Sequence, residues 1–191
     1  MNAADDPTEH ESDQSTRDRL LDAAVDIAGE AGVQAVTYRA VATRVGMAHG
    51  LVRHHFGTRE PLLIEAFRRA ATQDSDDVGL EANSIDEFAS DFVRTLNTSR
   101  NRQLLQYDET IHAVRGRLPV ENVQGAYRRY AALVRKTLDN AGVPDPDGAV
   151  AELVFSTLDG LVLQHMVFAD DERTSQLLEQ LRVVLRAMAT T

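Results

Sequence analysis

The segment VTYRAVATRVGMAHGLVRHHF, residues 36–56, predicts two short helices joined by a tight turn. Thr37 is suited to be the N-cap of the first helix, because its hydroxyl can accept a hydrogen bond from a first-turn N–H. Gly46 follows where a helix commonly ends in a left-handed residue. The second helix is then expected from about His49 to Phe56, so the segment should fold as a compact helical pair.

The outer face of this helical pair is polar. Val52 and Phe56 are spaced to point inward, and the side chains expected to face outward are His49, Gly50, Arg53 and His54, with Arg39 on the first helix. This is the layout of a helix-turn-helix, whose second helix lies in the DNA major groove and reads base edges. An ordinary corner of two helices with a polar surface has the same periodicity, so the pattern alone leaves both interpretations open.

Three segments in order separate these interpretations. They are TRDRLLDAAVDIAGEAG (16–32), VTYRAVATRVGM (36–47) and GLVRHHFGTREPLL (50–63). Over roughly residues 16–65 the chain resembles the tetracycline-repressor (TetR) family of transcriptional regulators, and the rest resembles that family only in general architecture. The resemblance implies a cytoplasmic, ligand-responsive regulator, most often a repressor, that binds a pseudo-palindromic double-stranded DNA operator as a homodimer. It also implies no enzymatic activity.

The resemblance assigns DNA contacts to individual side chains. Arg39 falls where the family makes a base contact, and arginine can bond to guanine O6 and N7 together. Thr37 and Tyr38 fall at phosphate-contacting places, and Arg59 stands where a lysine usually contacts phosphate. The remaining candidates, on the recognition helix, are His49, Gly50, Leu51, Arg53, His54 and His55.

The chain departs from the family pattern at two positions. Ala48 stands where the recognition helix usually has a serine or threonine N-cap, which should weaken the start of that helix. Arg53 replaces the usual tyrosine and exchanges a ring and hydroxyl for a charged fork. The operator sequence is therefore left open by the resemblance.

Charge is distributed unevenly along the chain, whose formal net charge is −10. Residues 1–15 hold five acidic residues and no lysine or arginine, and we expect them to form a disordered acidic tail. Residues 16–60, the expected DNA-binding domain, hold six arginines against five acidic residues. An acidic protein can still bind DNA, because a local positive face is what matters.

The composition narrows the chemistry. The chain has no cysteine, which excludes disulfides, thiol catalysis and cysteine-ligated metals and suits a reducing cytoplasm. The N-terminal residues lack the basic and apolar regions of a signal peptide. No glycine-rich phosphate loop is present, and we expect neither a cofactor nor a bound metal.

Residues 61–191 are expected to form a ligand-binding and dimerisation domain, which makes the whole chain an all-α fold of about nine helices. The fourth helix should begin after Thr58 as N-cap and, as in similar proteins, couple the two domains. A polar break is expected over residues 72–84. The further helices are expected over residues 84–97, 101–115, 119–140, 147–168 and 172–188.

The last two helices carry more apolar surface than one chain is expected to cover. Residues 149–168 are apolar nearly all round, yet Glu152, Asp159 and His165 interrupt them, so an interface fits better than a membrane span. In TetR-like proteins these helices pair with their symmetry mates, and the alternative is a core within one chain. We expect a twofold homodimer. The expected interface residues are Val154, Leu158, Leu161, Leu177, Leu181, Val184 and Leu185.

The larger domain is also expected to hold an effector pocket. Polar residues that interrupt apolar helices there could orient a ligand, and each could equally be a satisfied core or surface group. Few polar groups in an apolar cavity favour a small, largely apolar or aromatic molecule. The candidate residues are Tyr107, His112, Tyr127, Tyr130, Gln164 and His165.

Two other classes of function, a metal enzyme and a protein-interaction module, also have features of the sequence in their favour. Glu109 and His112 have the Glu-x-x-His spacing of di-iron helical bundles, but that chemistry needs a second such pair, and His165 has Val162 three residues before it. A helical protein-interaction module would explain an apolar dimer face. It leaves the outward-facing arginines and histidine of residues 36–56 without a role.

Overall fold

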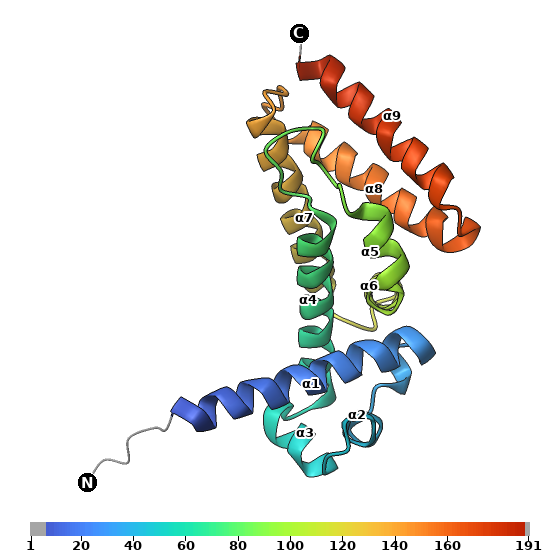
Figure 1. Ribbon diagram of the computed structural model, residues 1–191. Helices are drawn as coiled ribbons and strands as arrows, with labels where there is room; N and C mark the ends of the chain where they lie inside the picture. The colour runs from blue at the N-terminus through green and yellow to red at the C-terminus, as the bar shows by residue number, and fades with distance from the viewer. Residues whose placement is uncertain (1–6, 190–191) are drawn as a thin grey trace.

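The computed structural model describes the backbone of residues 7–189 and the side chains of residues 15–189. Within that range every regular element is helical, which confirms the all-α prediction (Figure 1). The elements are α1 (Pro7–Ala31), η1 (Val33–Ala35), α2 (Tyr38–Val45), α3 (His49–Phe56), α4 (Arg59–Val78), α5 (Phe92–Thr98), α6 (Arg100–Val114), α7 (Val120–Asn140), α8 (Ala149–Phe168) and α9 (Asp171–Ala189).

The described residues pack around two apolar cores. One core joins α1 to α2, α3 and the first half of α4, and the other joins the end of α4 to α5–α9. In Figure 1, α1 crosses beneath the bundle of α4–α9, and α2 and α3 hang below α1. α4 contributes to both cores, while Leu105 of α6 is fully buried in the lower one.

The helical pair forms as the sequence predicts. The Thr37 hydroxyl accepts a hydrogen bond from Ala40 N at 3.1 Å and caps α2. Gly46 has a φ of 69° and closes that helix, because glycine has no Cβ to clash in a left-handed conformation. Ala48 offers no side-chain cap to α3.

The polar break predicted over residues 72–84 begins only at Gly79, because α4 continues to Val78. Asp74 and Ser75 are buried in that extension rather than solvated. Arg102 Nε of α6 lies 2.8 Å from Asp74 Oδ1, and Gln106 Nε2 donates to Asp74 Oδ2 at 2.6 Å. These long-range partners allow a polar sequence to remain helical inside the protein.

The helix predicted over residues 84–97 is also largely wrong. Residues 84–91 form turns, and only α5 is helical. Ala89 has a φ of 53°, and its N–H donates to Gly79 O at 2.9 Å. The Arg182 guanidinium of α9 donates to the carbonyl oxygens of Phe88 at 2.7 Å and Ala89 at 3.2 Å. A contact about ninety residues away in sequence thus occupies carbonyls that a continuous helix would use.

The acidic tail differs from its prediction as well. α1 begins at Pro7, so the backbone of residues 7–15 is helical and not disordered. Residues 1–6 lie outside the described residues.

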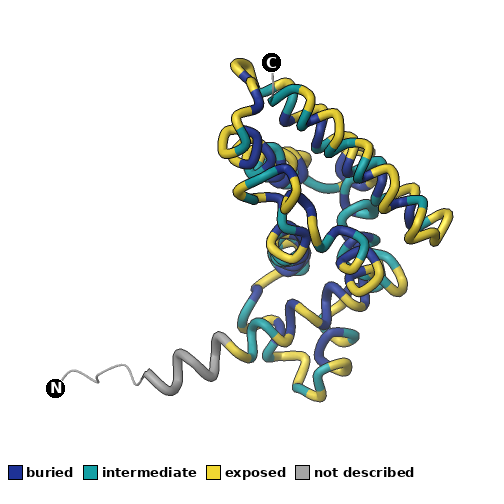
Figure 2. The backbone as a smooth tube through the Cα atoms, turned by 45° about the horizontal axis from the view of Figure 1, so that its top comes forward, coloured by how far each residue is buried: buried dark blue, intermediate teal, exposed yellow. Residues whose placement is uncertain are grey.

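The exposed residues of α8 and α9, yellow in Figure 2, include several apolar ones, but not all the residues predicted for an interface. Val154, Leu158, Leu161 and Leu185 are buried in the core of their own chain, which corrects their assignment to an interface, and Leu181 packs half-buried against that core. Leu177 and Val184 are exposed as predicted. The other exposed apolar residues of these helices are Leu153, Leu163, Val167, Phe168 and Val183.

By length and mean hydropathy, α8 is the one described helix that could cross a membrane, which for a single helix is weak evidence.

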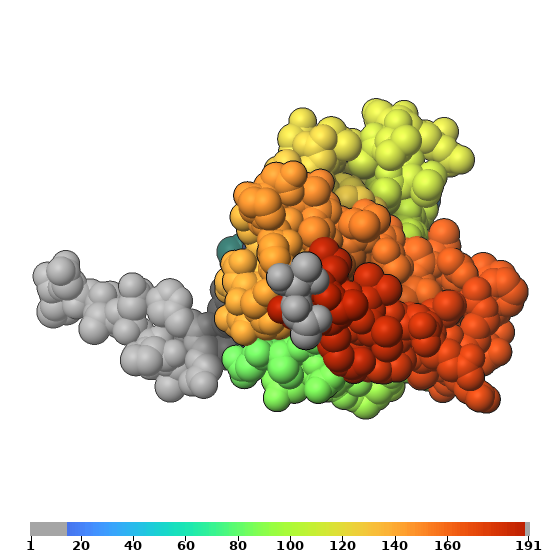
Figure 3. All heavy atoms as spheres, turned by 90° about the horizontal axis from the view of Figure 1, so that it is seen from above, coloured from blue at the N-terminus to red at the C-terminus, as the bar shows by residue number. Residues whose placement is uncertain are grey.

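The polar side chain of His165 connects α8 to its neighbours. His165 contacts Thr174 Oγ1 of α9 at 2.9 Å and Asn97 Oδ1 of α5 at 3.2 Å. Seen from above, α8 and α9 form one continuous surface of the molecule (Figure 3).

Candidate DNA interface and ligand pocket

The α2–α3 face presents two arginines that have no partner within the described residues. The six arginines of residues 16–60 fall into two groups, those bonded to other residues of the chain and those without such a bond in the described part of it. Arg17 pairs with Glu65, Arg44 with Glu30, and Arg19 donates to Val45 O. Arg39 and Arg53 are exposed and make no such contact in the described part of the chain. Their charges are therefore available to an outside partner.

The other residues assigned to DNA divide by exposure. Thr37, His49, Gly50 and His54 are exposed, whereas Leu51 is half-buried. His55 is half-buried, with its ring centroid 5.6 Å from that of His54. Fewer residues of α3 are therefore exposed than the resemblance predicts to contact DNA.

Two residues predicted to contact phosphate are already bonded within the chain. The Tyr38 hydroxyl donates to Gly57 O at 2.8 Å and ties α2 to the end of α3. The Arg59 guanidinium donates to Val36 O at 2.7 Å and to Val33 O. These contacts fix the segment around η1 against α4, so both side chains act first as supports of the helix-turn-helix.

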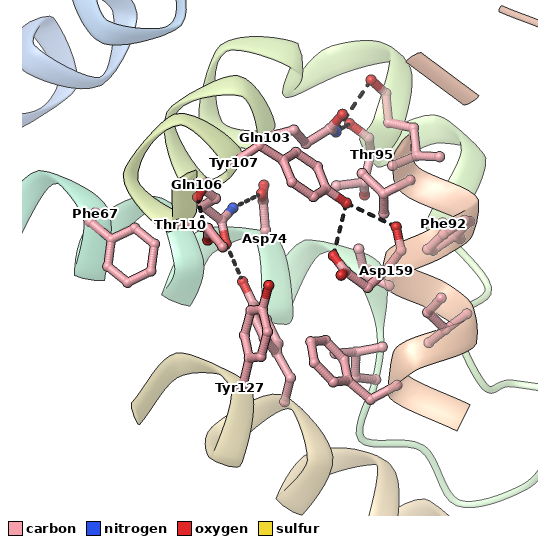
Figure 4. Close-up of a pocket in the computed structure, with 17 residues that line it drawn as sticks. Phe67, Asp74, Phe92, Thr95, Gln103, Gln106, Tyr107, Thr110, Tyr127 and Asp159 are labelled. Atoms are coloured by element: carbon pink, nitrogen blue, oxygen red, sulfur yellow. Dashed lines mark hydrogen bonds between the residues drawn. The ribbon is translucent and has the colours of Figure 1, made fainter. Parts of the chain in front are cut away.

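A cavity of about 90 Å³ lies in the larger domain between α4, α5, α6, α7 and α8 (Figure 4). Three of the six predicted ligand residues, Tyr107, Tyr127 and Tyr130, line it. The other three do not. Gln164 is exposed and accepts from Arg173, His165 bridges α5 and α9, and His112 faces the DNA-binding domain.

Sequence reasoning missed the carboxylates and amides of this cavity. Asp74 lies in the predicted polar break, and Asp159 appeared in the sequence only as an interruption of the apolar segment 149–168. Gln103, Gln106 and Thr110 share the i, i+3 and i+4 spacing with Tyr107 on α6, and that spacing was the signal that could have identified them. The further lining residues are Phe67, Val78, Leu80, Phe92, Thr95, Leu96, Phe155, Leu158 and Val162.

Hydrogen bonds hold the polar groups of the cavity wall. The Tyr107 hydroxyl donates at 2.8 Å to Asp159, with both the backbone oxygen and Oδ1 in reach (Figure 4). The Tyr130 hydroxyl lies 2.8 Å from Gln106 Oε1 and 3.0 Å from Ala71 O. Tyr130 therefore belongs to a polar network that includes Gln106 and Asp74.

Burial shifts the titration of these groups. Loss of hydration raises the pKa of Asp74 to about 6 despite the attraction of Arg102. Burial also raises the pKa of Asp159, and the hydrogen bond from Tyr107 opposes that shift. The pKa values of Tyr107 and Tyr130 are raised, first by burial and then by nearby carboxylates, so both hydroxyls are hydrogen-bond donors at neutral pH.

α6 also contacts the DNA-binding domain directly. Val33 N donates to Asp108 Oδ2 at 2.6 Å, and Gln34 Nε2 lies 3.3 Å from His112 Nε2. A Cβ on Gly29 of α1 would lie 2.4 Å from Asn101 Cα, so the two helix backbones are in close contact there.

Glu109 is buried on α6, one residue beyond Asp108, with 1% of its surface exposed. Burial raises the pKa of its carboxyl to about 8, and the charge of Asp108 adds to the shift. His112, its partner in the Glu-x-x-His spacing, donates from Nδ1 to Asp108 O at 2.8 Å. Within residues 15–189, no group of three potential ligands is placed to hold a metal ion.

Comparison with known proteins agrees with this arrangement. A family model described as the tetracyclin repressor-like C-terminal domain matches residues 81–190, and one described as bacterial regulatory proteins of the tetR family matches residues 20–66. A search of curated proteins found no match.

Solved structures match along most of the chain. A transcriptional regulator from Streptomyces coelicolor A3(2), SCO7518, is 26% identical, with a TM-score of 0.68 over 92% of this chain and 98% of its own. A TetR-family member from the same organism, SCO1917, is 25% identical, with a TM-score of 0.68 over 86% and 96%. The multidrug binding protein EbrR, solved with ethidium, shares the fold at 23% identity, with a TM-score of 0.60 over 86% and 96%. The chain belongs to the tetR family of bacterial transcriptional regulators.

Proposed function

We propose that this protein is a cytoplasmic homodimeric repressor that binds a pseudo-palindromic operator through α3 and is released from DNA by a small organic effector. The observation that carries the proposal is the pair of exposed arginines, Arg39 and Arg53, on a helix-turn-helix whose neighbouring arginines are paired internally. Arginine forks match both base edges and phosphates. A helical interaction module would leave this charge pattern without a use.

The exposed apolar face of α8 and α9 supports a dimer. Leu163 and Val167 on α8 and Val184 on α9 are at least half exposed, which is unfavourable in water. A second copy related by a twofold axis would cover the same residues on both chains. Two recognition helices can then read two half-sites, which supplies the affinity that one short helix lacks.

α6 is our proposed route between effector and DNA. Its Gln106, Tyr107 and Thr110 side chains line the cavity, while Asp108 and His112 contact the η1 region of the DNA-binding domain. A ligand that shifts α6 would therefore change the position of the recognition helix, together with α4, which enters both cores. Effector and DNA must then weaken each other's binding by the same factor.

The effector is proposed to be a small organic molecule bound in the cavity of Figure 4. Most of the lining is aromatic or aliphatic, with a few polar groups that can orient a ligand. The complex of EbrR with ethidium supports this proposal, because it shows that the same fold accommodates such a molecule.

The test is selection of bound fragments from genomic DNA by the purified protein. We expect the wild type to enrich a short palindrome and the Arg39→Ala/Arg53→Ala variant to enrich none. The matched control is Arg115→Ala/Arg128→Ala, which removes two exposed arginines from the larger domain and should retain the palindrome. A folded wild-type dimer that enriches no sequence would reject DNA recognition in favour of the interaction module.

A further inference from the structure

Asp159 lies in the cavity wall, and no cation among the described residues compensates its carboxyl group. It lies on α8, in the middle of the apolar helix, and its side-chain contact is the neutral Tyr107 hydroxyl at 2.8 Å. Within residues 15–189 no arginine, lysine or histidine forms an ion pair with it, and none of the 17 residues around the cavity is basic. A partly buried carboxylate without a cation is costly, so its presence needs a reason.

Asp74, on α4, is a second carboxylate of the cavity lining, and this one has a cationic partner. Arg102 Nε lies 2.8 Å from Asp74 Oδ1, and Gln106 donates to Asp74 Oδ2 at 2.6 Å. The same Arg102 reaches Asp77 Oδ2 at 2.6 Å through Nη2. This single positive charge is already shared by two carboxylates, so the cavity as a whole remains negative.

Aromatic rings stand beside this negative charge. Phe155 lies with its ring centroid 5.2 Å from Tyr127, edge to face, and 5.2 Å from Tyr130, stacked. Ring faces attract cations through their quadrupoles, most strongly where water is excluded. A carboxylate beside several ring faces is the combination that favours a cation with an apolar body over a neutral or anionic ligand.

We propose that the effector is a compact organic cation whose ammonium group binds beside Asp159 and whose apolar body packs against the rings of Tyr127 and Phe155. This inference rests on the proposed function and adds the charge and size of the ligand to it. The cavity of about 90 Å³ favours a molecule of about one ring. Tyr107 keeps the Asp159 carboxylate turned toward the cavity through its hydrogen bond.

The experiment is calorimetric titration of the purified full-length protein, without DNA, with pairs of equal shape that differ in charge. The pairs are benzylammonium with benzyl alcohol, and tert-butylammonium with tert-butanol. We expect the wild type to bind the better-fitting cation at least tenfold more tightly than its neutral counterpart. We expect Asp159→Asn to lower the affinity for that cation by tenfold or more and to leave the affinity for the alcohol within about threefold.

The control is Glu152→Gln, which removes the same charge from an exposed position of α8 and should change neither affinity. Asparagine can still accept the Tyr107 hydrogen bond, so Asp159→Asn should fold, and circular dichroism checks that it does. Equal affinity for cation and alcohol, an unchanged preference in Asp159→Asn, or no binding of either cation at millimolar concentration would each overturn the inference.

Failure here is distinguishable from failure of the proposed function. If the protein enriches a palindrome but shows no preference for cations, the regulator stands and the cationic effector does not. If a cation binds through Asp159 but leaves operator affinity unchanged, the ligand assignment stands and the coupling between pocket and DNA fails.

Discussion

Two surfaces of this protein expose groups that usually have a partner, and the groups differ: one surface exposes charge and the other exposes apolar side chains. The α2–α3 face exposes Arg39 and Arg53 without partners among the described residues, whereas the α8–α9 face exposes apolar residues such as Leu163 and Val167. Unpaired charge in water fits a polyanion, because counterions are released when phosphates are neutralised. Exposed apolar area fits another apolar surface. This contrast is the basis of our proposal that one face meets DNA and the other meets a second copy of the chain.

The largest expected effect comes from placing charge on the apolar face. Leu163→Arg with Val167→Arg should convert the proposed dimer to a monomer, because charge buried in an apolar interface lacks a partner. Operator affinity should then fall by roughly 100-fold or more, since a single recognition helix reads few bases. Sedimentation and operator binding measure the two effects. Val114→Arg, at an exposed apolar residue of α6, is the matched control and should remain dimeric.

A smaller effect is expected at Glu109, which is buried on α6, the helix that contacts the DNA-binding domain. Its folded pKa of about 8 exceeds the ordinary value of 4.5, so the native state keeps a proton that the unfolded chain releases. The free energy of unfolding should therefore fall as pH rises from about 4.5 to about 8, by on the order of 4 kcal/mol from this group. Glu109→Gln should remove that loss, as measured by urea unfolding at about pH 5 and about pH 8.5. The same slope in both proteins would refute the assignment.

Arg39 and Arg59 are expected to have different roles: Arg39 should contact DNA bases, whereas Arg59 should stabilise the fold. Arg39→Ala should cost about 1–3 kcal/mol of operator binding and relax specificity at one base position. Arg59→Ala should instead lower the free energy of unfolding by about 1–3 kcal/mol, because its guanidinium donates to the carbonyls of Val33 and Val36. Binding to operator and random DNA, together with denaturant unfolding, measures both. Equal losses on the two DNAs for Arg39→Ala would contradict base reading.

The smallest effect concerns the start of the recognition helix. Ala48 has an extended backbone and no capping side chain, so Ala48→Ser should supply an acceptor to the first turn of α3. We expect a gain of about 1 kcal/mol in the free energy of unfolding. Ala48→Gly is a useful contrast, because it changes the backbone without adding a hydroxyl. A serine variant no more stable than the glycine variant would show that the cap does not form.

The helix-turn-helix was predictable because its determinants are local. The Thr37 cap and the left-handed Gly46 act over three or four residues, and the sequence shows them directly. The predictions were wrong where the interacting residue is distant in the sequence. The polar end of α4 is helical because Arg102 and Gln106 satisfy Asp74, and residues 84–91 leave the helix where Arg182 of α9 binds their carbonyls.

The sequence by itself determined the all-α class, the position of the DNA-reading helix and the presence of surplus apolar surface on the last two helices. Only the tertiary structure decided which side of α8 is covered by its own chain, with Val154, Leu158 and Leu161 inside and Leu163 and Val167 outside. It also decided that Asp159 faces the cavity with no cation beside it in the described part of the chain, while Asp74 has Arg102. The physical reason is that the residue type determines whether a side chain favours burial or a polar partner. Packing determines whether the same chain provides that burial or that partner.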